Sequence, residues 1–382
     1  MTTSDPGFSA EDRALLRDAV ARFVARHGNR PRGRNAADDQ ALWREMAELG
    51  LAGLLVDADA GGTGGSDEEL ALVMELFGHG LIAEPFLGTT LLGASLIAAL
   101  GDAGQRARWL PALAAGELRT ALAHFEAASG QSRDPAGTRA SADGDGVVLH
   151  GDKSVVFDAP VAGLLLVSAC EAGGRSLFAV PAQAAGLTLR PWAAVDGRSA
   201  ADLVLDGVHL PGPSRLGPPG GAAQAIEHAL DRATLAVCSD ALGSMQALLA
   251  QTREHLRTRR QFGQPLARQQ VLQHRVVDMH IAVEESRALL AAARASLATA
   301  GPAGDESHAP ERQAAVSAAK YKLGQGARFV GEQAVQLHGA MGMTDELAVS
   351  HHFKRLLMAE AMYGDADFQL ARFRAAGGGV PG

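Results

Sequence analysis

The order of apolar and polar residues divides the chain into three parts. Between Ser9 and Gly116, apolar residues recur three and four positions apart, which is the spacing of helices with one buried face. After Gly116 the pattern changes to short apolar runs separated by turns that contain Gly and Asp, as is typical of β-strands. Helical spacing resumes from about Gly221, after two segments rich in Pro and Gly.

The same pattern predicts individual elements. We expect a first helix behind Ser9, a plausible N-cap, and further helices at about 39–49, 67–78, 87–100 and 105–115. We expect strands at 147–149, 154–157, 164–168, 177–180, 187–191 and 201–205. Residues 301–310 are predicted to be a loop and 377–382 a disordered tail. The sequence thus predicts an α+β, mainly α, protein with a helical domain (1–117), a β domain (118–220) and a helical bundle (221–382).

Composition narrows the class of protein. The chain has 382 residues, 47% of them hydrophobic and only 4% aromatic, which suits a large core of close-packed helices. A net charge of −8 argues against a general nucleic-acid binder. Cys170 and Cys238 are too few for a disulfide framework or a zinc cluster. The polar, acidic start and the short apolar stretch 91–100 predict a cytoplasmic protein without a signal peptide or membrane span.

The most unusual stretch is a basic turn at 257–270. Four arginines surround Phe262, and a Gly- and Pro-containing turn separates a long incoming helix from one that leaves after Leu266. Arginine forms forked hydrogen bonds to phosphate oxygens, and Phe262 could cover a planar ring. On charge alone, however, a solvated helix end that complements the helix dipole is the better interpretation.

The motif R-x-Q-F-G-x-P-L-x-x-x-Q, at residues 259–270, resembles a signature of the acyl-CoA dehydrogenase flavoproteins. The resemblance implies that Arg259, Gln261 and Phe262 reach the pyrophosphate and adenosine of an FAD held mainly by a neighbouring subunit, with Gln270 closing the motif. The order of helices, strands and helices also matches this family over essentially the whole chain. It implies a central β-barrel or sandwich and a C-terminal four-helix bundle.

A second motif lies at residues 336–342 and resembles the family's Q-x-H-G-G-x-G. The resemblance implies that Gln336, His338, Gly339 and Ala340 meet the same FAD pyrophosphate, with Ala340 replacing the second glycine. Glycine there lets backbone N–H groups approach phosphate oxygens closely. Taken alone, His338 would more often be a structural histidine, but beside the first motif we interpret it as cofactor-binding.

The segments that resemble the family's flavin-ring site depart from its pattern. Thr-Glu-Pro is replaced by Phe125-Glu126-Ala127, and Lys-x-Trp-Ile-Thr by residues 153–157, which read Lys-Ser-Val-Val-Phe. The hydroxyl group and the tryptophan are therefore missing. Backbone N–H groups of these segments could still serve the flavin oxygens and N5.

The resemblance implies α,β-desaturation of an acyl-CoA thioester, which needs a carboxylate base in an apolar pocket. In the position of the family's glutamate this chain has Tyr363, and a phenol with a pKa near 10 is a poor base at neutral pH. Asp365 and Asp367 follow, in what reads as a solvated turn.

Some family members place the base on the first helix of the last domain, directly before an arginine. Asp231 and Arg232 occupy that position, and Asp231 begins an apolar row at helical spacing. The resemblance therefore implies that Asp231 is the catalytic base and that Arg232 binds substrate. The plainer alternative, an ion pair between Asp231 and a nearby cation, is equally consistent with the sequence.

These observations predict an FAD-dependent acyl-CoA dehydrogenase that uses an acyl-CoA substrate and an electron-transfer acceptor. We expect a homodimer, a homotetramer or a heterotetramer with a paralogous subunit. Residues 339–346, 352–356 and 363–367 resemble the small subunits of heteromeric dehydrogenases such as the pimeloyl-CoA type. The alternative is therefore a non-catalytic subunit that completes a partner's FAD site, and a flavin-free helical scaffold is a third possibility.

Overall fold

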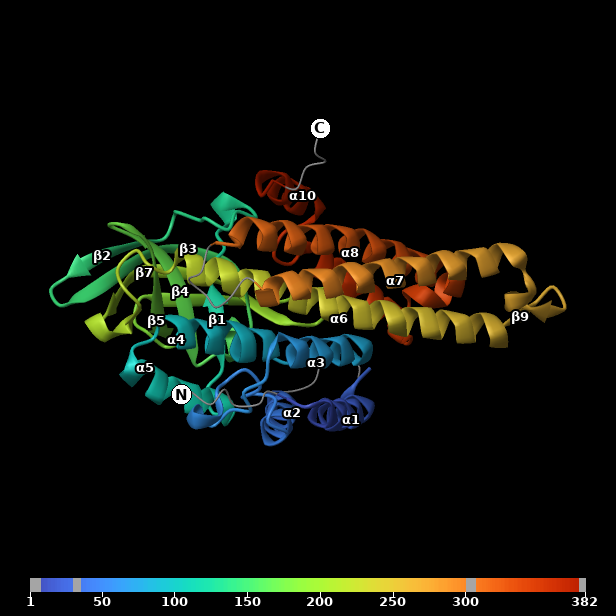
Figure 1. Cartoon of the computed structure of the whole chain (residues 1–382), viewed down its shortest axis with the longest axis horizontal. Coiled ribbons are helices and arrows are strands. Elements are labelled where there is room, and N and C mark those ends of the chain that lie inside the picture. Colours follow the sequence, from blue (N-terminus) through green and yellow to red (C-terminus); the bar gives the residue numbers. More distant parts are fainter. Residues whose placement is uncertain (1–7, 30–35, 300–306, 378–382) are drawn as a thin grey trace.

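The computed structural model describes residues 8–29, 36–299 and 307–377 and confirms the predicted order of helices, strands and helices (Figure 1). The β domain lies at one end of the long axis, and the C-terminal helices extend from it to the other end. The N-terminal helices lie on one side of the longest helix, and only some of them pack directly against it. The mainly α, α+β fold class is therefore correct.

The N-terminal part contains five α-helices in its described residues: α1 (Ala10–His27), α2 (Ala36–Glu48), α3 (Asp67–Gly80), α4 (Ala94–Leu100) and α5 (Ala103–Ala114). A π-helical segment, Leu87–Gly93, leads directly into α4. Ser9, Ser66 and Asp102 each form a capping box, in which the side chain of the N-cap and that of the third helical residue bond each other's backbone. These caps fix where α1, α3 and α5 begin.

The middle part is an eight-stranded sheet. Its strands are β1 (Thr120–Ala123), β2 (Arg139–Asp143), β3 (Gly146–Phe157), β4 (Leu164–Glu171), β5 (Gly174–Pro181), β6 (Leu187–Ala193), β7 (Ser199–Leu210) and β8 (Arg215–Leu216). The order is β6-β7-β3-β2-β4-β5-β8, and β1 pairs with β4 in parallel.

Two predictions about strands were incomplete. The runs expected at 147–149 and 154–157 belong to one strand, β3, whose pairing with β7 shifts register after Leu149 and between Lys153 and Val156. Such irregularities break the alternation of apolar residues, so the strand looks like two. β1, β2 and β8 were not predicted, because β1 is short, β8 has only two residues, and β2 is largely exposed and polar.

The C-terminal part consists of α6 (Ala223–Thr258), α7 (Gln270–Thr299), α8 (Ala309–His338), α9 (Ala348–Ala361) and α10 (Ala366–Ala375) among the described residues. Helix α6 is long and apolar enough to cross a membrane, but 89% of its most apolar stretch is buried inside the protein. It contributes Leu230 to the core shared with the N-terminal helices and Leu242 to the core of the bundle. Helix α6 therefore joins the N-terminal helices to the C-terminal bundle.

Two loop predictions fall partly outside the described residues. Of the loop expected at 301–310, residues 301–306 are outside them, and Ala309 and Pro310 already belong to α8. Residues 378–382 of the expected tail are likewise outside.

A small hairpin projects from the far end of the bundle, between α6 and α7 (Figure 1). Its strands are β9 (Arg260–Gln261) and β10 (Gln264–Pro265), paired antiparallel. The two residues of its turn, Phe262 and Gly263, both have positive φ, +52° and +78°, as a tight hairpin turn of this kind requires. Phe262 is 89% exposed.

Candidate functional site

A cavity of about 200 Å³ lies where the three parts of the chain meet. Most of its wall is apolar and includes Phe77, Phe86, Leu92, Leu122, Phe125, Phe157 and Met362. Four of the described lining residues can carry a charge near neutral pH: Glu84, Asp158, Arg198 and Asp240. An apolar cavity with a few convergent polar groups is the usual form of a small-molecule site.

Tyr363 lines this cavity, in the loop between α9 and α10. Its backbone has a φ of +57°, an uncommon conformation for a residue with a bulky side chain. Burial raises the pKa of its phenol above the usual range, and the negative charge of Asp158 adds to this effect. A phenol with a raised pKa does not accept protons at neutral pH, so Tyr363 cannot replace the family's glutamate as a base.

Asp158 is a cavity residue that the sequence analysis did not select. Its side chain is buried at the end of β3, and burial raises the pKa of its carboxyl group to about 7, although Arg198 and a backbone hydrogen bond with Gly88 partly oppose the shift. This carboxyl group therefore changes charge near neutral pH. The sequence signal was a single acidic residue directly after an apolar strand, which by itself is an ordinary turn residue.

A buried ionic network forms the wall behind Asp158. The side chain of Asp196 lies 3.0 Å from Arg198 and 3.2 Å from Arg355. Asp240, on α6, lies 3.2 Å from Arg355 and 3.6 Å from Arg198. Arg355 also donates a hydrogen bond to the carbonyl oxygen of Ile82 and so links α9 to the N-terminal part.

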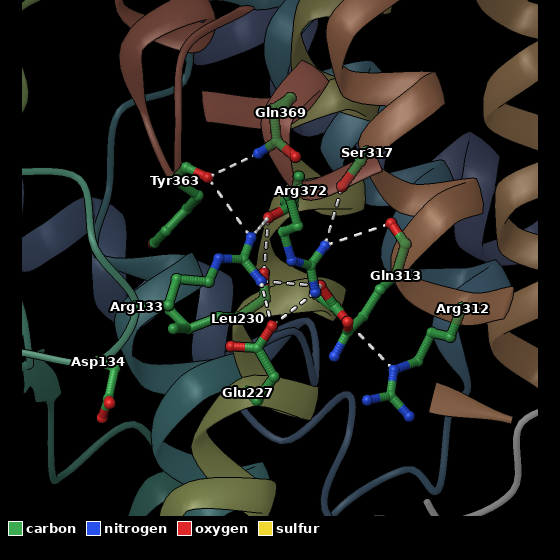
Figure 2. A network of polar contacts seen from close by, with 12 residues as sticks. Arg133, Asp134, Glu227, Leu230, Arg312, Gln313, Ser317, Tyr363, Gln369 and Arg372 are labelled. Atoms are coloured by element: carbon green, nitrogen blue, oxygen red, sulfur yellow. Dashed lines mark hydrogen bonds and ion pairs between the residues drawn. The ribbon is translucent and has the colours of Figure 1, made fainter. Parts of the chain in front are cut away.

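Asp231 lies in a different network, whose Arg133, Arg312 and Arg372 are labelled in Figure 2, and it is outside the set of described residues that line the cavity. Its Oδ1 accepts hydrogen bonds from Arg133 at 2.8 Å and from Arg372 at 2.7 Å, and its Oδ2 accepts one from Arg312 at 3.0 Å. Burial alone would raise the pKa of this carboxyl group, but the charges of Arg133 and Arg372 outweigh it and lower the pKa. The carboxylate stays ionised, with both oxygens engaged.

The same network supports the cavity wall. Besides Asp231, Arg133 contacts the side chain of Thr234 at 2.9 Å and the carbonyl oxygen of Tyr363 at 3.4 Å (Figure 2). Gln369 donates to that carbonyl as well, at 2.9 Å. The network thus joins the loop after β1 and the loop after α9, both of which line the cavity, to α6.

Two of the other candidates, Arg232 and Asp365, also have structural partners. Arg232 contacts Asp67 at 2.8 Å and Ser95 at 2.6 Å, so its guanidinium joins α6 to α3 and α4. Asp365 caps α10 and accepts a hydrogen bond from Gln131 at 2.7 Å. Asp367 is exposed in the first turn of α10.

The two predicted phosphate motifs lie together at the far ends of α6 and α8. The rings of His255 on α6 and His338 on α8 have centroids 4.4 Å apart. The other predicted cofactor residues at this end are exposed or partly exposed and include Arg259, Gln261, Phe262, Gln270, Gln336, Gly339 and Ala340. His338 is buried, and its Nδ1 lies 2.8 Å from the carbonyl oxygen of Ala334. We call this end the motif surface.

Open space adjoins the motif surface at Gly339. Its φ is +64°, and a Cβ atom built there would meet no described heavy atom within 4 Å. The backbone at this point can therefore be approached closely, as binding of a pyrophosphate requires. Together with the exposed guanidinium of Arg259, this geometry fits the phosphate portion of FAD.

The motif surface is remote from the cavity of the same chain. Arg259 follows Asp240 by nineteen positions on α6, which corresponds to about 28 Å along a helix axis. One chain therefore carries two separate surfaces, and the motif surface lies remote from the cavity of its own chain.

The segments predicted to hold the flavin ring are fixed by a buried ion pair. Lys153 Nζ lies 2.7 Å from Glu126 Oε1. Burial lowers the pKa of Lys153 to about 8. Burial would raise the pKa of Glu126, but Lys153 and the hydrogen bonds from Thr138 outweigh this effect and lower the pKa to about 2. Two backbone N–H groups in the second segment already have partners, since Ser154 donates to Phe125 O at 2.9 Å and Val155 to Asp202 Oδ1 at 3.0 Å.

Comparison with known proteins gives consistent matches over most of the chain. Residues 10–117 match the model of the acyl-CoA dehydrogenase N-terminal domain, and residues 220–377 match that of the C-terminal domain. Acyl-CoA dehydrogenase FadE12 of Mycobacterium tuberculosis (strain ATCC 25618 / H37Rv) is 28% identical over 353 residues, covering 89% of each chain. The human mitochondrial short-chain specific acyl-CoA dehydrogenase is 28% identical over 338 residues, covering 85% of this chain and 79% of its own.

A solved structure is similar over almost the full length. A variant of the Tcur3481-Tcur3483 steroid ACAD is 30% identical in sequence, with a TM-score of 0.84, and the match covers 96% of this chain and 98% of that one.

Proposed function

Because this chain belongs to the acyl-CoA dehydrogenase family, we propose that it is a subunit of an FAD-dependent enzyme that desaturates an acyl-CoA thioester between its α- and β-carbons. The observation that carries the proposal is the separation of the two surfaces along α6. A motif surface remote from its own cavity suits a flavin site that is completed by a second chain. We therefore propose that each complete site takes two chains.

The roles of the chain's own residues follow from their chemistry. At the motif surface, Arg259 would form forked hydrogen bonds to the pyrophosphate of FAD, and Phe262 would cover the adenine. The backbone N–H groups after His338 would approach the same phosphates. When bound, FAD supplies the oxidant that takes up a hydride from the β-carbon.

The cavity would receive the acyl group. Its apolar wall excludes water from the α-carbon, which favours proton transfer by raising the pKa of a nearby carboxyl group. We infer that Asp231, held ionised by three arginines, is a structural anion and that Arg232 is likewise structural. The sequence-based assignment of these two residues to the reaction therefore has no support from their contacts.

A second candidate function is favoured by Tyr363. With a phenol at the position of the family's base, and with the N–H groups of Ser154 and Val155 already engaged, the chain's own cavity lacks familiar parts of the reaction site. The chain would then complete the flavin site of a paralogous partner and leave the chemistry to that partner. The 30% identical relative, whose name joins Tcur3481 with Tcur3483, suits this alternative.

Flavin content distinguishes the two candidates. The full chain is purified alone and together with a paralogous acyl-CoA dehydrogenase subunit, and visible absorbance is recorded before and after anaerobic addition of a panel of acyl-CoA thioesters. A yellow chain that bleaches when alone supports the first candidate. A colourless chain that yields a yellow, bleachable complex only with its partner supports the second. Absence of flavin in both preparations overturns the proposal.

A further inference from the structure

Within the mainly apolar cavity, the wall beside Met362 carries an incompletely bonded guanidinium. The side chain of Arg198 is only 10% exposed and lines the cavity. Its Nη1 lies 3.0 Å from the sulfur of Met362, which is a weak acceptor. Its Nη2 is 3.6 Å from Asp240 Oδ1, which is too long for a hydrogen bond, and makes no other in the described structure.

The charges around Arg198 are nearly balanced without a ligand. Arg198 and Arg355 contribute two positive charges, and Asp196 and Asp240 two negative ones, all within the distances given above. Asp158 adds a further carboxyl group in the same wall, and because burial raises its pKa to about 7, this group is neutral in mildly acidic solution. A ligand carboxylate would therefore bring an uncompensated negative charge into a buried site.

An uncharged ligand oxygen fits the hydrogen-bonding groups of this wall better than a carboxylate or a plain hydrocarbon chain does. A hydroxyl or carbonyl oxygen can accept a hydrogen bond from Arg198, and a hydroxyl group can also donate one to Asp158 or Asp240. A plain hydrocarbon chain offers no acceptor and would leave Nη2 of Arg198 without a hydrogen bond. Hydrogen bonding to a buried group of this kind is what lets a site reject an analogue that lacks the oxygen.

We propose that Arg198, together with Asp158 and Asp240, determines substrate specificity by selecting acyl groups that carry an uncharged oxygen, a hydroxyl or ketone, on the carbon chain. This inference rests on the proposed function, in which the cavity receives the acyl group. It goes further by naming the chemical class of that group. Plain alkyl chains and chains that end in a carboxylate are disfavoured.

The test is direct binding of matched thioesters to the full-length protein, with its partner subunit where flavin binding requires one. Dissociation constants are measured by anaerobic titration calorimetry for hexanoyl-CoA, for the hydroxyhexanoyl-CoA isomers and for adipoyl-CoA. We expect at least one hydroxy isomer to bind about tenfold more tightly than hexanoyl-CoA. Adipoyl-CoA should bind more weakly than that isomer.

Variants assign the preference to Arg198. In Arg198→Met the hydroxy isomer should lose most of its advantage over hexanoyl-CoA. Because Arg198→Met removes one of the two arginines that contact Asp196, Arg198→Lys is a second variant that keeps the positive charge but loses the fork, and it should reduce the preference several-fold. The matched control is Arg190→Met, the same substitution at an exposed site on β6 of the same hairpin, which should keep the wild-type preference.

Two sets of results would overturn the inference. Equal or tighter binding of hexanoyl-CoA or adipoyl-CoA by the wild-type protein, or a preference that persists in both Arg198 variants, removes the specificity role while leaving the acyl site intact. Binding of none of the thioesters would instead refute the acyl role of the cavity, and the inference with it. The two failures are therefore distinguishable.

Discussion

Arg133 Nη1 lies 2.8 Å from Asp231 Oδ1, although the two residues are 98 positions apart in the chain. This contact fixes a loop of the β domain to α6. Nη2 of Arg133 also donates to the carbonyl oxygen of Tyr363. Asp231 is thus the anion that holds two walls of the cavity together without lining it. Its place at the start of an apolar row, which suggested a catalytic carboxylate, has a structural explanation.

Asp231→Asn should strongly destabilise the fold. The substitution removes a buried negative charge that pairs with Arg133, Arg312 and Arg372, and breaking a buried ion pair by removing one partner typically destabilises by about 3–5 kcal/mol. Glu227 still pairs with Arg133 and Arg372 in the variant, so we expect a value near the lower end of this range. Denaturant unfolding monitored by circular dichroism measures the change. Asp367→Asn, an exposed site on α10, is the control and should unfold like the wild type. A stable Asp231→Asn that retains flavin but no longer desaturates substrate would instead restore Asp231 as the base.

Lys153→Met should also destabilise the protein by about 3–5 kcal/mol, because it leaves the carboxylate of Glu126 buried without its cation. The double variant Lys153→Met/Glu126→Gln removes both charges and should recover part of the loss. Lys322→Met, which breaks a more exposed ion pair with Glu285, serves as the control and should change stability by less than about 1 kcal/mol. If Lys153→Met, the double variant and Lys322→Met were equally stable, the ion pair between Lys153 and Glu126 would have no role in fixing the two flavin-ring segments.

Local patterns predicted the helices well because each buries one face. Helices α3, α6 and α8 each have apolar residues at regular spacing on their buried side, and Ser9 is the N-cap of α1, as predicted. The strands were harder, since the register shifts in β3 interrupt its alternation and β2 has almost no buried side. Those features depend on pairing with distant strands, which the local pattern does not contain.

The site shows the same division. Each of the two phosphate motifs is a single unbroken run of residues, and the structure brings the two runs together at the ends of α6 and α8. By contrast, the three arginines around Asp231 are between 81 and 141 positions away, so the sequence could indicate a buried carboxylate but not its partners. Asp158 and Arg198 were missed for the same reason, because only the fold places them in one cavity.

Asp158 should make stability depend on pH near neutrality. Its pKa is raised from 3.8 to about 7 in the folded state, mainly by burial, with Asp196 and Glu84 adding to the shift and Arg198 opposing it. The unfolded chain releases this proton at lower pH, so the contribution of the group to stability is complete below pH 3.8 and is lost as the pH rises through about 7. Arg119 and Tyr363 also interact with this charge.

The variant Asp158→Asn removes this titration. We expect the free energy of unfolding of the variant relative to that of the wild type to increase from about pH 4 to about pH 7 and then to level off. Urea unfolding of both proteins across this pH range measures the difference in their free energies of unfolding. The contributions of the other titrating groups are the same in both proteins and cancel in this difference. Asp206→Asn, at a carboxylate that is 91% exposed, should show no such trend. A pH-independent difference for Asp158→Asn would mean that Asp158 is ionised throughout in the folded protein.

Arg259→Ala should weaken FAD binding much more than it weakens the fold. The residue is exposed at the end of α6, so its loss removes little packing, whereas a forked contact between arginine and phosphate contributes about 1.5–3 kcal/mol. That corresponds to roughly 10- to 100-fold weaker retention of flavin, measured by equilibrium dialysis of the assembled protein. Arg259→Lys should recover only part of the affinity because an ammonium group has no fork. Arg257→Ala, an exposed arginine in the last turn of α6 outside the motif, is the matched control. Normal flavin occupancy in Arg259→Ala, or an equal loss in Arg257→Ala, would show that the basic turn is a solvated helix end, the interpretation that its charge alone favours.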